Sequence, residues 1–78
     1  MNQLKFFSEL LAALGYNNFI YPDKNKIRVV NRLHAYDILF SEQGTFAFAA
    51  VLKYDNEQNG FVHQHTYFDA SEFFVYFI

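Results

Sequence analysis

The 78-residue sequence predicts an α+β fold, in which an N-terminal helix, an antiparallel sheet of four or five strands and a short C-terminal helix follow one another. Two patterns favour this order. Apolar residues recur at helical spacing near the N-terminus, and apolar and polar residues alternate at a period of two in later segments. The glycines, Gly15, Gly44 and Gly60, fall between these segments. A chain of this length holds one core, so residues 1–78 are interpreted as a single domain.

Residues 3–14 are expected to form an amphipathic helix that packs on the sheet. The large apolar residues of this segment recur at i, i+3, i+7 and i+10, which places them on one helix face. They are Leu4, Phe7, Leu11 and Leu14. Asn2 is a suitable N-cap, and Gly15 stands where a helix commonly ends in a left-handed residue.

The next segments predict a β-hairpin and a third strand. Residues 19–21 and 26–31 are rich in residue types that favour strands. The turn between them begins with Pro22, whose fixed φ suits that position of a turn. Residues 36–40 alternate again and are expected to form the third strand.

Residues 45–54 form the longest apolar run and are expected to lie in the middle of the sheet. At a period of two, one face of this strand carries Phe46, Phe48, Ala50, Leu52 and Tyr54, and the other carries Ala47, Ala49, Val51 and Lys53. Helices over the alanine side would leave the aromatic side uncovered, and the pattern is equally compatible with the reverse arrangement. Residues 61–68 are a further strand, which pairs with 45–54 as a hairpin, because the intervening Asn-Gly favours a tight turn.

The C-terminal segment, residues 70–78, is predicted to be a short helix. Asp69 is suited to be its N-cap, and Glu72 stands three residues later, as in a capping box. A last strand is the alternative, because Phe, Val, Tyr and Ile all favour strands. The capping signal favours the helix.

The sequence contains no pattern that points to catalysis. His63 and His65 flank Gln64, so both imidazoles are expected on one strand face as candidate metal ligands. There is no cysteine and no further ligand spacing, so we predict two surface histidines, no metal and no cofactor. The serines lie in no nucleophile setting and no glycine-rich phosphate loop exists, so we predict that the protein is not an enzyme.

Four of the six basic residues share one parity along the segment 24–32 and form a basic stripe. They are Lys24, Lys26, Arg28 and Arg32. Such a stripe suits a phosphate backbone or an acidic protein surface, whereas the simpler interpretation is an edge strand whose charges prevent aggregation. The net charge of −2 argues against a generic nucleic-acid binder.

The uncovered apolar face predicts a protein-binding module. Its expected contact residues are Phe46, Phe48, Leu52 and Tyr54. We expect a protein partner, and a second copy of the chain as well, which would make a homodimer. The alternative functions are a nucleic-acid-associated module that uses the basic stripe and a homodimeric structural or accessory protein.

Compact, cysteine-free chains of this length include the inhibitors that phages and other mobile elements direct against host defence complexes, anti-CRISPR proteins among them. By type alone, we therefore expect an inhibitor of a host protein complex. No segment reaches the roughly 20 apolar residues of a membrane span. The expected location is the cytoplasm, or the host cytoplasm if a phage encodes the chain.

Overall fold

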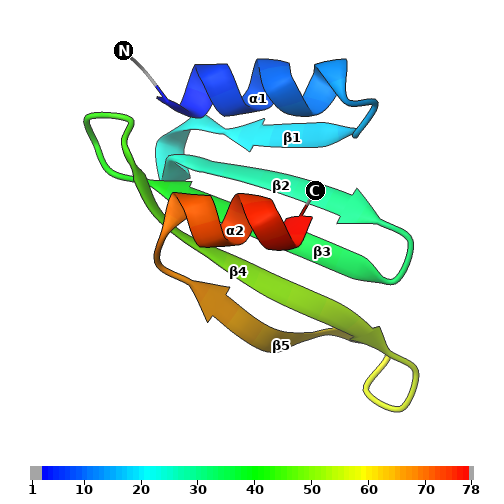
Figure 1. Ribbon diagram of the computed structural model, residues 1–78. Coiled ribbons are helices and arrows are strands. Elements are labelled where there is room, and N and C mark those ends of the chain that lie inside the picture. The colour runs from blue at the N-terminus through cyan, green and yellow to red at the C-terminus, as the bar shows by residue number, and fades with distance from the viewer. Residues whose placement is uncertain (1–2, 78) are drawn as a thin grey trace.

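The computed structural model describes residues 3–77 and confirms the predicted α+β architecture (Figure 1). Asn2, the expected N-cap of the first helix, and residue 78 lie outside the described residues. The elements in chain order are α1 (Gln3–Ala13), β1 (Asn18–Tyr21), the 3-10 helix η1 (Pro22–Lys24), β2 (Lys26–Asn31), β3 (His34–Phe40), β4 (Phe46–Asp55), β5 (Gly60–Tyr67) and α2 (Ala70–Phe77).

The five strands form one antiparallel sheet in the order β1-β2-β3-β4-β5, in which each strand pairs with its neighbours in sequence. Both predicted hairpins, one over residues 19–31 and one over residues 45–68, are confirmed. The third strand begins at His34, two residues earlier than predicted. The strands are joined by short turns, and most of the other described residues lie in α1 and α2.

Local signals set the end of α1 and the start of α2 as predicted. Gly15 ends α1 with a φ of 89°, which glycine adopts without steric cost. The Tyr16 backbone N–H donates to the Leu11 carbonyl at 2.9 Å, as in a Schellman motif. At the start of α2, the Asp69 carboxylate accepts from the backbone N–H of Ser71 at 2.7 Å, so the last segment is a capped helix and not a strand.

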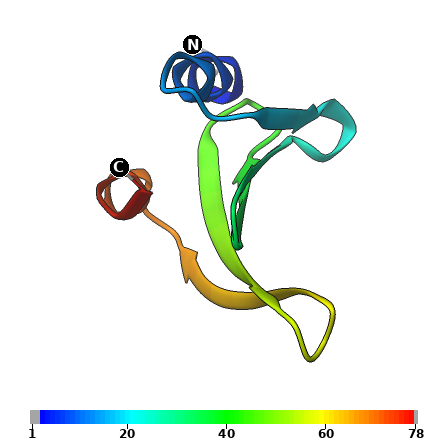
Figure 2. The same ribbon diagram turned by 90° about the vertical axis from the view of Figure 1, so that its right-hand side faces the viewer.

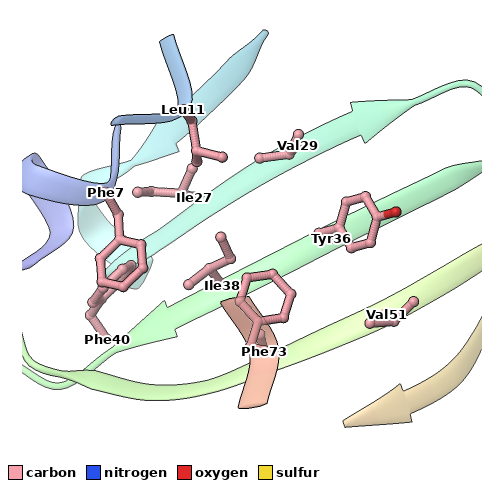
Figure 3. Close-up of a cluster of buried hydrophobic side chains, with 10 residues drawn as sticks. Phe7, Leu11, Ile27, Val29, Tyr36, Ile38, Phe40, Val51 and Phe73 are labelled. Carbon is pink, nitrogen blue, oxygen red and sulfur yellow. The ribbon is translucent and has the colours of Figure 1, made fainter. Parts of the chain in front are cut away.

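Both helices lie on the same face of the sheet, and the core fills the layer between them and the strands (Figures 1 and 2). Side chains of β2, β3 and β4 form the sheet side of this layer, and side chains of α1 and α2 form its helix side (Figure 3). The buried cluster consists of Phe7, Leu11, Ile27, Val29, Tyr36, Ile38, Phe40, Ala49, Val51 and Phe73.

Aromatic rings join the two helices to each other and to the sheet. Phe7 of α1 stacks on Phe74 of α2, with ring centroids 4.8 Å apart and planes within 13°. Phe73 points into the sheet, where its ring lies 6.4 Å from Phe46 and 6.0 Å from Tyr67. Burial of one such ring contributes about 1.5–3 kcal/mol, so a few of them account for much of the stability of a small domain.

A β-bulge in β4 changes the predicted facing of one residue. Phe40 of β3 pairs with Phe46, whereas the preceding Leu39 pairs with Phe48. Ala47 is therefore an extra residue, and the alternation of faces shifts by one position there. The prediction that Phe46 lies on the uncovered face is wrong, because the bulge turns its ring into the aromatic layer beneath the helices.

The buried position of Phe73 generates a first prediction. Its side chain is 1% exposed, whereas Val75 on the outer side of α2 is 83% exposed. We expect Phe73→Ala to lower the free energy of unfolding by about 3–5 kcal/mol, because it removes apolar contact and leaves a cavity. Val75→Ala should change it by less than about 0.5 kcal/mol. Urea unfolding of both variants measures the difference, and equal losses would contradict this packing.

Tyr36 occupies the middle of the helix-covered face. Its ring lies edge-on to that of Phe77, with centroids 5.0 Å apart. Burial raises the pKa of Tyr36 to about 12 from the ordinary value of 10.0, and the neighbouring Tyr76 adds a smaller upward contribution. The folded protein therefore keeps this phenol protonated at pH values where the unfolded chain releases the proton.

This pKa predicts a loss of stability in alkali. Between pH 10 and about 12 the unfolded chain binds fewer protons than the folded one at Tyr36, so the free energy of unfolding falls as pH rises. The contribution is fully present below pH 10. We expect Tyr36→Phe to weaken the dependence, measured as the urea midpoint at pH 8, 10 and 11. Identical pH profiles for the variant and the wild-type protein would contradict the assignment.

Candidate functional site

The face of the sheet opposite the helices, called the open face, has no helix over it among residues 3–77 (Figure 2). Its residues follow from the strand register, because directly opposed residues point to the same side of a sheet. They form a first row of Tyr21, Lys26, Leu39 and Phe48, a middle row of Phe19, Arg28, Asp37, Ala50 and Thr66, a third row of Val30, Ala35, Leu52 and His63, and the pair Tyr54 and Phe61 beyond it.

Large apolar side chains on this face contact solvent. Phe19 is 53% exposed, and Val30 and Phe61 are each 41% exposed. Phe48 and Leu52 are half-buried by their neighbours on the strands. Large exposed apolar patches are uncommon on monomeric proteins and usually mark an interaction site.

An ion pair lies in the middle row of the open face. Arg28 donates from Nε to Asp37 Oδ1 at 2.6 Å and from Nη2 to Asp37 Oδ2 at 2.8 Å. The two residues are directly opposed on β2 and β3, so the register itself brings them together. The hydrogen bond to Asp37 raises the pKa of the Arg28 guanidinium, which stays charged at any physiological pH. The pair therefore places fixed charge among apolar side chains of the open face, which we call the apolar frame. These are Phe19, Val30, Ala35, Leu39 and Ala50.

The structure keeps only part of the predicted basic stripe on one surface. Lys26 and Arg28 lie on the open face, whereas Lys24 belongs to η1 and Arg32 lies in the turn after β2 with a φ of 57°. The edge-strand interpretation is wrong, because β2 is an inner strand between β1 and β3. Lys26 Nζ lies 4.9 Å from the centre of the Tyr21 ring, a cation-π contact.

The two histidines of β5 do not share a face as predicted. His65 pairs with Val51 and His63 with the next residue, Leu52, so a second bulge leaves Gln64 as the extra residue. His63 Nε2 lies 2.7 Å from the Thr66 hydroxyl on the open face. His65 lies on the helix-covered side. Within residues 3–77, no three His, Asp or Glu side chains are placed to bind one metal ion.

A hollow of about 520 Å³ lies at the far end of the β4–β5 hairpin, away from the open face residues of the middle row. Its lining includes Lys53, Asp55, Glu57 and Gln64. The Asp55 carboxylate accepts from the backbone N–H of Glu57 at 2.8 Å, which accounts for it as a turn residue. Nothing in this lining pairs a nucleophile with a base, so the hollow offers no catalytic arrangement.

Part of the open face could be predicted from the sequence. The structure places Phe48, Leu52 and Tyr54 on it as expected. It adds residues that the sequence analysis did not single out, namely Phe19, Val30, Leu39, Asp37 and Phe61. The signal that identifies them is the cross-strand register, which the lengths of the short turns constrain.

No protein-family model matches the chain, and no curated protein or solved structure matches it either. Neither helix of residues 3–77 has the length and apolar character needed to cross a membrane. The function is therefore argued from the geometry of the open face.

Proposed function

We propose that the protein is a small binding module that docks another protein on its open face and acts without catalysis. The observation that carries this proposal is the exposure of Phe19, Val30 and Phe61 on a face that no helix of residues 3–77 covers. Exposed apolar area of this extent costs free energy in water, and a partner that buries it recovers that cost.

The size and chemistry of the open face fit a protein interface. Five strands about 4.8 Å apart span roughly 20 Å, and the ten residues of β4 extend for roughly 33 Å. A standard interface buries about 800 Å² on each partner. Binding hot spots are enriched in aromatic residues and arginine, and this face combines Phe19, Phe48 and Tyr21 with Arg28.

The proposal extends to how such a module acts. A chain with a broad docking face and no catalytic group changes its partner by occupying a surface. Small inhibitors from phages and mobile elements, anti-CRISPR proteins included, are of this type, and inhibition of a host complex in the host cytoplasm is the role that we assign by type.

The open face also favours one second candidate, a module that binds single-stranded nucleic acid. Lys26 lies beside Tyr21, and Phe19 is exposed next to them, so bases would find both stacking surfaces and positive charge. Asp37 opposes this function, because it neutralises Arg28 and repels phosphate. We therefore rank protein binding first.

A charge introduced into the open face tests the proposal. We expect the tagged wild-type protein in its native cells to elute in an assembly larger than the monomer, and Phe48→Asp or Leu52→Asp to release it, because a carboxylate would be buried without a partner. Val75→Asp, on the solvent side of α2, is the matched control and should stay in the assembly. Circular dichroism confirms that each variant is folded.

Two outcomes would contradict the proposal. One is a wild-type protein that elutes as the free monomer, and the other is a folded Phe48→Asp variant that remains in the assembly. Salt separates the two candidates, because an apolar protein interface persists at high ionic strength, whereas phosphate contacts weaken steeply.

A further inference from the structure

We propose that a second copy of the chain occupies the open face, in a two-fold symmetric dimer with the Arg28–Asp37 pair near the axis. This inference rests on the proposed function, because it names the protein that docks on the open face; a second copy there takes the place of the host complex as the occupant of that face. It is supported by the charges of the middle row, by the hydrogen-bonding capacity of Arg28 and by the sizes of the side chains around the pair.

The charges of the middle row are self-complementary. Arg28 lies on β2 and Asp37 lies directly opposite on β3. A two-fold axis parallel to the strands and between β2 and β3 exchanges these two strands across the interface. It sets Arg28 against the partner's Asp37 and Asp37 against the partner's Arg28. The four groups then form a neutral ring of alternating charge.

The unused donors of Arg28 give this arrangement a second physical reason. A guanidinium has five N–H groups, and the bond pair to Asp37 uses two of them. A partner that removes water from the apolar frame must accept hydrogen bonds at this point, or leave charged donors unsatisfied. The partner's Asp37 offers acceptors, since each carboxylate oxygen accepts more than one hydrogen bond.

The same axis matches large side chains with small ones. It exchanges β1 with β4, so Phe19 of the middle row lies over the partner's Ala50. The first row is the exception, because there two large rings meet, Tyr21 and the partner's Phe48. In the third row, Val30 lies over the partner's Ala35. Aligned sheets pack face to face at about 30° in this way, with side chains of the two inner faces interdigitating.

A charge exchange between two variants tests the dimer. We expect light scattering on the purified wild-type protein to give twice the 9.2 kDa chain mass at high protein concentration, and a mass that falls towards that of one chain on dilution. Arg28→Asp alone and Asp37→Arg alone should each weaken the dimer at least tenfold, because like charges then meet at the axis. An equimolar mixture of the two should recover the doubled mass, because opposite charges meet again.

Phe19→Asp provides an independent variant on the exposed outer strand, where a polar residue leaves the core intact. We expect it to be a folded monomer, whereas Val75→Asp, on α2, should remain a dimer. A wild-type monomer at every concentration overturns the proposal. So do a Phe19→Asp variant that still dimerises and a mixture of folded charge variants that stays monomeric.

The outcome separates this inference from the proposed function. A purified wild-type monomer that still joins a Phe48-dependent assembly in its native cells leaves the open face as a docking site for a different protein. A monomer in both settings removes both proposals, and an assembly that dissolves with salt indicates nucleic acid.

Discussion

The aromatic layer between the helices and the sheet determines which face of the sheet is covered. Phe7 stacks on Phe74, and Phe73 inserts above Tyr67 and Phe46, so α1 and α2 are fixed to one face of the sheet. A short chain has few elements with which to bury apolar surface, and both helices of this one are used on the same side. Among residues 3–77, no helix covers the opposite face.

Much of the fold could be predicted because its signals are local. The left-handed Gly15 and the Asp69 cap act within a few residues, and the hairpins follow from short turns. The bulges could not be predicted, because they depend on packing between distant segments. Ala47 is skipped so that Phe46 reaches the ring of Phe7, 39 positions earlier in the chain, and no period-two pattern contains that information.

In the candidate site, too, local pattern predicted some features, whereas others depended on contacts between distant segments. The parity of β4 correctly placed Phe48, Leu52 and Tyr54 on one face, but the pairing of Arg28 with Asp37 needed the register between two strands. That pairing leaves Arg28 and Asp37 as a neutral pair in the middle row, with the charge of Lys26 in the row beside it. It also makes the face complementary to a rotated copy of itself, which a surface with one sign of charge would not be.

We propose that the side chains of β4 divide between a permanently buried face and a face that a partner covers. The most direct measurement is NMR of the Val51 and Leu52 methyl groups with a soluble paramagnetic probe, at low and high protein concentration. These residues are adjacent on β4 and face opposite sides. We expect the Val51 methyl signals to be protected throughout, and the Leu52 methyl signals to be broadened when the protein is dilute and protected when it is concentrated. Leu52 protected at every dilution, or broadened at every concentration, would contradict it.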